Sequence, residues 1–236
     1  MIEYSILVPT RARPSNMKRL CNSVFSTASN PESVEVIFYI DDDDLESITA
    51  AEELKLNHNI KYFTGERIVL SQMWNKCYDL SSGNYLMLCC DECIFHTTDW
   101  DKTVLDKFAE FDDKIAFVYG NDLNMYLLDD KFGVYGFLHR NWTTTVGYFV
   151  PPYFSSDFND TWLNDVAKKI GRHFFIPIIT EHMHPGAGKA QLDRTHMERL
   201  ARHKADGVEN KYYSLEHERE RDAKKLKNFI NNYKKQ

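Results

Sequence analysis

The sequence predicts an α/β fold in which helices flank a mostly parallel central sheet. Short runs rich in β-branched and aromatic residues alternate with segments whose apolar residues recur every three or four positions, and this alternation is typical of parallel sheets. The 236 residues are 43% hydrophobic and 14% aromatic, enough to bury a sizeable core. We therefore expect an α/β domain over residues 1–195 and a charged, mildly basic helical extension over residues 196–236.

Each predicted strand is a short run of mainly apolar residues. The strands are expected at residues 5–10 (SILVPT), 34–40 (VEVIFYI), 60–63, 85–90 (YLMLCC), 115–119 and 174–184. The first run is closed by proline, and the second ends abruptly in four aspartates.

The predicted helices lie between these strands and follow the spacing of their apolar residues. They are expected after Ser15 through residue 28, and at residues 45–56, 69–80, 103–111, 160–170 and 196–236. Ser15 is placed to cap the first helix, and Gly171 follows the helix at 160–170 as a typical stop. Residues 120–156, which are aromatic and contain Pro151–Pro152, are expected to be irregular.

Charge is distributed unevenly along the chain. The formal net charge of −6 argues against a protein whose whole surface binds nucleic acid. From His196 onward, however, 11 Lys and Arg outnumber 7 Asp and Glu, whereas the residues before it hold 18 against 28. A basic extension on an acidic body suits an anionic partner, and it equally suits a solvated helix of mixed charge.

Neither secretion nor a membrane location is indicated. No apolar run reaches the roughly 18 residues of a membrane span, and the start, MIEYSILVPT, lacks a basic region and a cleavage site. The five cysteines are an odd number, and three of them crowd between Cys89 and Cys93, which disfavours a disulfide framework. We expect a soluble, cytoplasmic protein without an obligate protein partner.

The carboxyl ends of the predicted strands carry an arginine and several carboxylates. Thr10 and Arg11 follow the first strand, Asp41–Asp44 the second, and Asp91 and Glu92 the fourth. Ligands of open α/β sheets bind beyond the carboxyl ends of the strands, so we expect these residues to line one site. The first strand is not followed by a glycine-rich loop, which argues against a dinucleotide-binding or Walker-type phosphate site.

Four stretches carry a family resemblance: SILVPTRARP, VIFYIDDDD, LMLCCDE and FNDTWLNDVAKKIGRHFFIP. In this order they resemble the first strand and loop, the second strand, the Asp-x-Asp strand and a later acidic, helical segment of GT-A glycosyltransferases of the family-two group. The similarity is closest to small glycosyltransferases of tailed phages, in which PTR-x-RP, a Trp-Asn pair, GYFVPPYF, NDTWLNDVA and EHMHP recur. It covers about residues 4–193.

The resemblance implies a GT-A fold and an inverting glycosyltransferase that moves a sugar from a nucleotide-diphosphate donor, expected to be a UDP-sugar. A divalent cation, Mn²⁺ or Mg²⁺, would neutralise the leaving diphosphate. It would be held mainly by Asp91, with Glu92 as a helper. Cys89 stands where the family has its first carboxylate, so the ribose contact is either missing or supplied elsewhere.

Residues that match the donor side of the family are expected to contact the nucleotide or its phosphates. They are Thr10, Arg11, Arg13, Asp41, Asp43, Arg67, Asn75, Asp91 and Lys189. Asp41 and Asp43 can accept hydrogen bonds from a base or a ribose, although the four aspartates also fit an exposed acidic turn. Lys189, in the loop GAGK, is placed to neutralise phosphate or is a solvated lysine.

His182 and His184 are separated by one residue in a predicted extended stretch. Side chains two positions apart on a strand point the same way, so both rings can face the site. The resemblance implies that one of them binds the metal or the diphosphate, and the alternative is a pair of surface histidines.

Asp160 is the expected general base. An inverting transfer needs a carboxylate that removes the proton of the acceptor hydroxyl, and Asp160 matches the second acidic position of the family's acidic pair. The alternative role for Asp160 is a helix N-cap, and Asp157 is the second candidate base. A retaining transfer would need no such base.

The acceptor and the cysteines leave alternatives open. The phage resemblance implies a hydroxylated pyrimidine of phage DNA in the host cytoplasm, contacted by the basic extension, with HRNWTTTVGYFVPPYF shaping the acceptor side. Cys89, Cys90 and Cys93 lack a second cysteine pair downstream, so buried apolar residues fit better than a structural zinc site. The alternative functions are a nucleotidyltransferase, which would show a glycine-rich first loop, and a non-catalytic nucleotide- or sugar-binding module.

Overall fold

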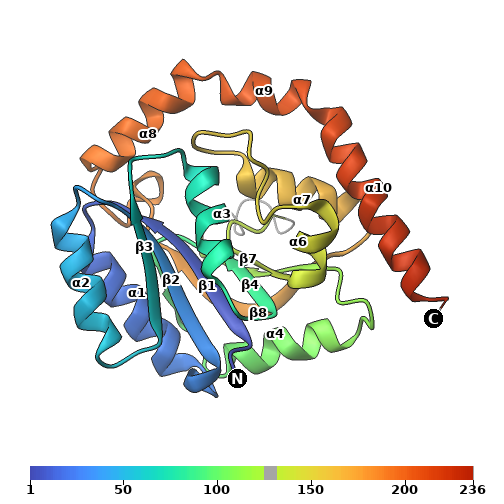
Figure 1. Ribbon diagram of the computed structural model, residues 1–236, viewed down its shortest axis with the longest axis horizontal. Helices are drawn as coiled ribbons and strands as arrows, with labels where there is room; N and C mark the ends of the chain where they lie inside the picture. The colour runs from blue at the N-terminus through green and yellow to red at the C-terminus, as the bar shows by residue number, and fades with distance from the viewer. Residues whose placement is uncertain (125–131, 236) are drawn as a thin grey trace.

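A single sheet of eight strands organises the computed structural model, which describes residues 1–124 and 132–235 (Figure 1). Its spatial order is β3-β2-β1-β4-β7-β6-β8-β5. The strands are β1 (Tyr4–Thr10), β2 (Val34–Asp41), β3 (Ile60–Gly65), β4 (Tyr85–Leu88), β5 (Cys93–Phe95), β6 (Phe117–Asn121), β7 (Gly136–His139) and β8 (His173–His182).

Most neighbouring strands run parallel, as the sequence predicts. β3, β2, β1 and β4 form a parallel half, and β6 pairs in parallel with β8. β7 lies antiparallel between β4 and β6, and β5 pairs antiparallel with β8 at the edge. The carboxyl ends of β1, β2, β4, β6 and β8 therefore lie at the same edge of the sheet.

Helices cover both faces of this sheet. They are α1 (Pro14–Thr27), α2 (Leu45–Lys55), α3 (Leu70–Leu80), α4 (Trp100–Ala109), α6 (Arg140–Val146), α7 (Asn159–Lys169), α8 (Arg194–Ala205), α9 (Val208–Ser214) and α10 (Glu216–Tyr233), with short 3₁₀ turns η1 (Pro31–Ser33) and η2 (Pro185–Ala187). Because side chains alternate along β1, Ile6 and Val8 pack with α1, α2 and α4, whereas Leu7 packs with α3, α6 and α7.

Several expected boundaries are wrong. Residues 120–156 are not wholly irregular, since they contain β7 and α6. β7 is only four residues long, and it is defined by antiparallel pairing with β4 and β6 rather than by a pattern of its own. The first helix begins at Pro14 with Arg13 at the N-cap position, so Ser15 is not its cap. Proline is well suited to the first helical position, where its missing N–H would have no partner.

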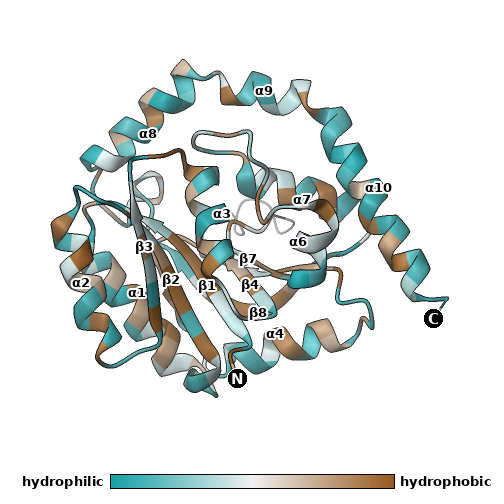
Figure 2. Ribbon diagram, viewed as in Figure 1, coloured by the Kyte–Doolittle hydropathy of each residue, from teal (hydrophilic) through white to brown (hydrophobic). Residues whose placement is uncertain are grey.

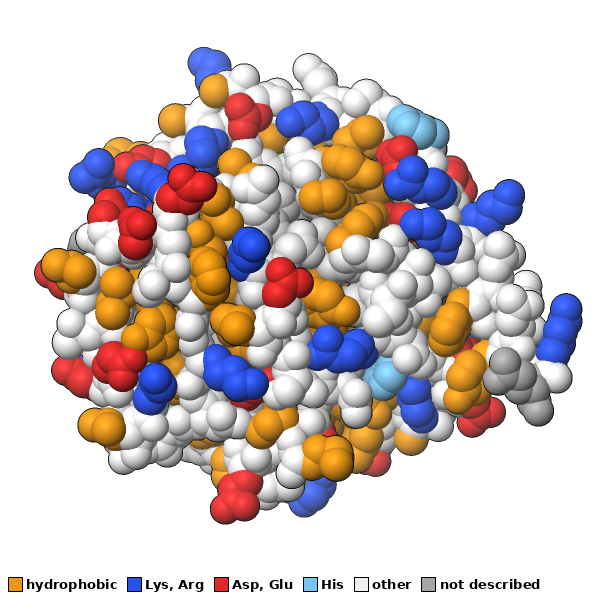
Figure 3. All heavy atoms as spheres, in the orientation of Figure 1, with side chains coloured by type: hydrophobic (Ala, Val, Ile, Leu, Met, Phe, Trp, Pro, Cys, Tyr) orange, Lys and Arg blue, Asp and Glu red, His pale blue; other side chains and the backbone are white. Residues whose placement is uncertain are grey.

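The helices α8, α9 and α10 form an arc around one side of the molecule (Figure 1). They are mainly hydrophilic (Figure 2), yet Val208, Tyr212, Leu226 and Ile230 are buried in the core beneath α6 and α7. The expected boundary between residues 195 and 196 falls inside α8. On the face in Figure 3, acidic and basic side chains are interspersed over these helices. None of the described helices combines the length and apolarity that crossing a membrane requires.

Candidate functional site

A cleft of about 220 Å³ lies at the carboxyl ends of β1, β2 and β4. Thr10 and Arg11, Asp41, and Asp91 with Glu92 line it, so the structure brings together the three strand ends that the sequence analysis selects. The end of β8, the loop before α7 and one side of α8 complete the lining.

The first loop is tied to the loop after β4. The Thr10 hydroxyl donates a hydrogen bond to Asp91 Oδ2 at 2.6 Å, and Arg13 donates to Asp91 Oδ1 at 3.2 Å. Asp91 is buried, and this burial raises its pKa, while Arg13 and Thr10 act in the opposite direction. Both Asp91 oxygens thus already have donors from the first loop.

Arg11 neutralises part of the aspartate run after β2. Its guanidinium bonds Asp41 Oδ2 at 2.7 Å and forks onto Asp43 at 2.5 and 3.0 Å. Asp44 caps α2 by accepting from the Ser47 N–H. These contacts explain why the run is tolerated, since unpaired neighbouring carboxylates would repel one another.

Asp41 is the member of this run that faces the cleft. It is 1% exposed, and its Oδ1 is buried without a hydrogen-bond partner among the described residues. Burial raises the pKa of Asp41, while Arg11 lowers it. A buried acceptor without a partner is costly, so a ligand that donates an N–H or O–H to Asp41 would be favoured.

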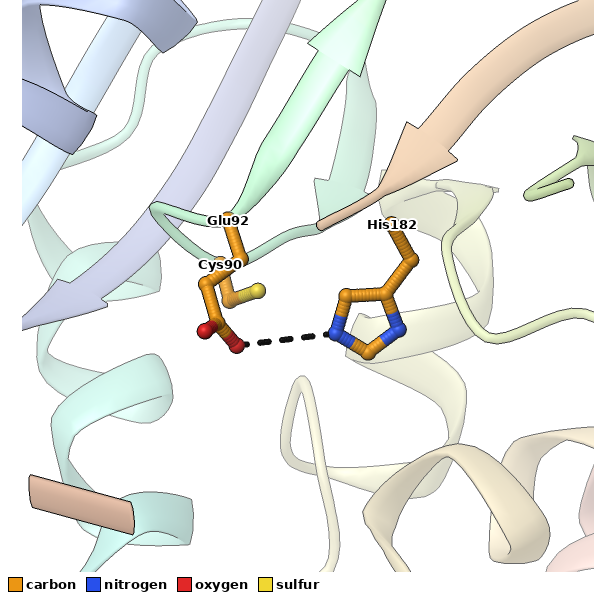
Figure 4. Close-up of side chains that lie close together, drawn as sticks. All are labelled: Cys90, Glu92 and His182. Atoms are coloured by element: carbon orange, nitrogen blue, oxygen red, sulfur yellow. Dashed lines mark ion pairs between the residues drawn. The ribbon is translucent and has the colours of Figure 1, made fainter. Parts of the chain in front are cut away.

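Glu92 faces two histidines across the cleft. Its Oε1 lies 2.8 Å from His196 Nε2, and its Oε2 lies 3.6 Å from His182 Nε2 (Figure 4). Burial acts to raise the Glu92 pKa, but His182 and the charge of Arg13 bring it below its ordinary value. Glu92 is therefore an ionised carboxylate that lies beside the Arg13 guanidinium and the imidazole rings of His182 and His196.

Both His182 and His184 line the cleft, as their spacing predicts. The two rings lie 5.0 Å apart, and Glu181 points away to pair with His96 and Lys189. Burial lowers the pKa of His184, and the nearby His182 acts in the same direction. A neutral imidazole can act as a ligand or a hydrogen-bond acceptor.

Asp160 lies in the first turn of α7 and also lines the cleft. Burial, reinforced by the charge of Asp157, raises the pKa of Asp160 to about 6. The N-cap position is occupied by Phe158, so Asp160 is not the N-cap. Asp157, by contrast, is engaged by Arg199 and by His203 at 2.5 Å. Of the two candidate bases, Asp160 is the one without a cationic partner in these contacts.

Helix α8 supplies cleft residues that the sequence analysis missed. His196, Arg199 and Arg202 line the cleft, and Asp193, just before the helix, pairs with Arg13 at 2.8 Å. The segment reads as a solvated charged helix because its composition is polar throughout. The signal that could have identified it is the three-residue spacing of His196, Arg199 and Arg202, which places them on one face.

Three expected donor contacts do not line the cleft: Asn75, Lys189 and Asp43. Asn75 lies on α3, where its amide bonds backbone groups of Phe149 and Val150, so it holds a loop against the helix. Lys189 pairs with Glu181 at 2.7 Å and donates to a backbone carbonyl, because the turn η2 carries it away from the strand ends. Asp43 is held at the rim by Arg11, and Arg67 lines the cleft and pairs with Glu198.

The residues that could hold a divalent cation are Cys90, Glu92 and His182, whose ligand atoms lie within 4.8 Å of one another (Figure 4). The 3.6 Å between Glu92 and His182 is too long for a good hydrogen bond. Asp91, expected as the main ligand, is turned toward Thr10 and Arg13 instead. Carboxylate and imidazole together fit a divalent transition metal such as Mn²⁺.

The fold is shared with solved glycosyltransferase structures. A mannosyltransferase from Pyrobaculum calidifontis, in complex with GDP-Man and Mn²⁺, superposes with a TM-score of 0.63 at 12% identity, over 88% of this chain and 64% of that one. The chain has the GT-A fold. S. aureus TarS 1–349 in complex with UDP-GlcNAc matches with a TM-score of 0.57 at 11% identity, over 84% of this chain and 61% of that one.

The complex of S. aureus TarS 1–349 with UDP gives a TM-score of 0.56 at 11% identity, over 76% of this chain and 57% of that one. The chain thus spans less than two thirds of the length of each of these structures. No protein-family model and no curated protein matches the sequence.

Proposed function

We propose that this protein is a metal-dependent glycosyltransferase that moves a sugar from a nucleotide-diphosphate donor to an acceptor hydroxyl. The observation that carries the proposal is the juxtaposition, in one cleft, of the Glu92–His182 pair and the half-buried carboxyl of Asp160. The GT-A fold supports it, since structures of that fold were solved with GDP-Man and Mn²⁺ and with UDP-GlcNAc.

The donor is proposed to lie with its base toward Asp41 and its diphosphate toward Glu92. The free Oδ1 of Asp41 would accept a hydrogen bond from an N–H of the base, which uracil and the other nucleobases all offer, so the choice of a UDP-sugar rests on the family resemblance. Thr10, Arg11, Arg13 and the lining residue Arg67 would surround the nucleotide. A cation bound by Glu92 and His182 would supply charge stabilisation to the leaving diphosphate.

Asp160 is proposed as the general base of an inverting transfer. With a pKa of about 6 it is largely ionised at neutral pH and still basic enough to accept a proton. The acceptor oxygen attacks the anomeric carbon while Asp160 takes the hydroxyl proton. The bond from that carbon to the β-phosphate oxygen breaks, and the diphosphate leaves with the electron pair.

The proposed acceptor is a hydroxylated pyrimidine of phage DNA. The excess of Lys and Arg after His196 supports a contact between the C-terminal helices and a polyanion. Arg199 and Arg202 of α8 also border the cleft itself.

Calorimetric titration of UDP, GDP, ADP and CDP, with and without Mn²⁺, tests the donor site. We expect one nucleotide to bind in a Mn²⁺-dependent way and to lose that dependence in Glu92→Gln. The variant Asp91→Asn tests Asp91, which the sequence analysis expects to be the main metal ligand. Glu53→Gln, on the exposed face of α2, is the matched control. Absence of nucleotide binding under every condition would refute the proposal.

A non-catalytic binding module is the second candidate, and Cys89 favours it. This residue, at the family's first carboxylate position, is fully buried and offers no carboxylate to a ribose. The two candidates differ in turnover. Once a nucleotide that binds has been found, the protein is incubated with UDP-sugars and DNA that carries hydroxylated pyrimidines. A glycosyltransferase would release UDP, and a binding module would not.

A further inference from the structure

Cys90 is set apart from the two cysteines beside it by its position. Cys89 and Cys93 are fully buried in the core, where they act as the small apolar residues that the sequence predicts. Cys90 instead lines the cleft, and its thiol lies beside the Glu92 carboxylate and the His182 ring (Figure 4). The simple apolar interpretation therefore does not extend to Cys90.

Backbone hydrogen bonds hold these three side chains together from two elements. Cys90 and Glu92 belong to the loop between β4 and β5, whereas His182 ends β8. The register pairs Cys93 with His182, and the Met183 N–H donates to the Glu92 carbonyl at 2.9 Å. The loop and the strand end are thus fixed on both sides of the cluster.

The spacing of the cluster suits ligands of one ion. Glu92 Oε2 and His182 Nε2 are 3.6 Å apart, beyond a hydrogen bond but within the separation of two donor atoms that each lie about 2.0–2.2 Å from a shared metal. The Cys90 sulfur lies within 4.8 Å of a carboxylate oxygen of Glu92 and of a ring nitrogen of His182. A small closing movement of the side chains would bring all three into contact with one cation.

We propose that Cys90 is a metal ligand, so that the divalent cation at this site is held by a thiolate, a carboxylate and an imidazole. The inference rests on the proposed function for the use of the ion beside a donor diphosphate, whereas the site itself follows from the three side chains. Sulfur and imidazole ligands favour a borderline metal such as Zn²⁺ or Co²⁺, and Mg²⁺ binds such a set poorly.

The surroundings of Cys90 fit this role. The Tyr135 hydroxyl lies 2.9 Å from the Cys90 sulfur and can donate a hydrogen bond to a thiolate. The Tyr135 ring also packs edge-on against His182, with centroids 5.1 Å apart, which orients the imidazole. Outer contacts of this kind fix the ligands of metal sites. When the metal binds, the thiol proton is released to the buffer.

Asp91 is a poorer third ligand than Cys90. A cation bound at Asp91 would lie close to the Arg13 guanidinium, which contacts Asp91 Oδ1 at 3.2 Å. Arg13 also approaches Glu92 through Oε1, at 3.5 Å, and leaves Oε2 facing His182. Arg13 therefore contacts the Glu92 oxygen that is not the one facing His182, and its charge disfavours a cation at Asp91 more than one at Glu92 Oε2.

Titration of the full chain with Co²⁺, followed by absorption spectroscopy, tests the proposal without any activity measurement. A thiolate ligand gives an intense near-ultraviolet charge-transfer band that oxygen and nitrogen ligands do not give. We expect the band in the wild type and in Cys93→Ala, the matched thiol control. In Cys90→Ser we expect the band to vanish and Co²⁺ affinity to fall at least about tenfold, the lower end for loss of an outer contact.

Competition and nucleotide binding complete the test. Equimolar Zn²⁺ should displace Co²⁺, whereas a large excess of Mg²⁺ should leave the band unchanged. Co²⁺ binding without the band, or a band that persists in Cys90→Ser and Cys90→Ala, would overturn the role of Cys90. Calorimetry with UDP and Mn²⁺ on the same samples separates the two proposals. UDP binding without the charge-transfer band would contradict only the role of Cys90 as a metal ligand. The band without nucleotide binding would contradict only the proposed donor site.

Discussion

Replacement of Arg13 by alanine gives a direct test of how the cleft is held together. Arg13 is 11% exposed in its side chain and contacts two buried carboxylates, Asp91 and Glu92, at 3.2 and 3.5 Å. Arg13 also forks onto Asp193, whose side chain is 42% exposed, at 2.8 and 2.9 Å, and solvent screening makes the loss of that contact the smaller part of the cost. The cost of Arg13→Ala should therefore come mainly from stranding the two buried carboxylates.

Removing one partner of a buried ion pair costs about 3–5 kcal/mol. We expect about 3 kcal/mol for Arg13→Ala at pH 7.5, at the lower end, because Asp91 can take up a proton once its cation is gone. Without Arg13 the folded-state pKa of Asp91 rises further above its unfolded value, and a raised carboxyl pKa costs stability as pH rises. The deficit should thus be smaller at pH 5 than at pH 7.5.

Urea denaturation of the metal-free protein, followed by the fluorescence of its buried tryptophans, measures the deficit. Arg13→Lys keeps the charge and should restore part of the stability. Arg194→Ala is the matched control, since Arg194 is 84% exposed and, in the part of the chain that the structure describes, forms an ion pair only with Glu198 of the same helix. A deficit for Arg13→Ala below about 1 kcal/mol, or one independent of pH, would refute this reasoning.

Three further predictions concern catalysis and packing. Activity should rise with pH through about 6 as Asp160 ionises, and Asp160→Asn should lower kcat at least about 100-fold without loss of nucleotide binding, measured as UDP release. Asn75→Ala should cost about 1–3 kcal/mol in denaturation, since it leaves the Val150 backbone groups without partners. Gly120→Ala should lower the Tm, because a Cβ would lie 2.5 Å from the Ile178 carbonyl oxygen.

Each of these has a control on the same element or a decisive negative outcome. Asp165→Asn, also on α7, should leave the pH dependence of activity unchanged. If the activity of the wild type does not rise with pH around 6, Asp160 is excluded as the base. Gln72→Ala, on the exposed side of α3, should unfold like the wild type. A Gly120→Ala variant with the wild-type Tm would mean that β6 and β8 can separate more easily than their packing indicates.

The strands and the cleft edge were predictable because their signals are local. β1 and β2 are mainly apolar runs, interrupted by Ser5 and Glu35, and the polar residues at their carboxyl ends stand out against them. Once the strands are taken as parallel, their ends meet at one edge, which places Thr10, Asp41 and Asp91 together. The same argument could not show whether Asp91 or Glu92 is the better metal ligand, because that depends on which of the two carboxylates Arg13 and Thr10 contact.

What could not be predicted depends on contacts between distant residues. β7 is a four-residue strand whose identity comes from pairing with β4 and β6 rather than from its own pattern. The part played by α8 is equally hidden, because a charged helix that lies over a cleft has the same composition as a solvated one. His196 is 5% exposed even so, buried between Glu92 and Asp193.

The pairing of Arg13 with Asp193 and His196 joins positions that are 180 and 183 residues apart. During synthesis at about 5–20 residues per second, the Glu92 carboxylate between β4 and β5 would wait roughly 5–20 s for His196 of α8 to be made. For that interval Glu92 lacks its nearest histidine, and the edge of the sheet is open. The order of translation therefore completes the cleft only after every strand of the sheet has been made, and before α9 and α10 add their residues to the core.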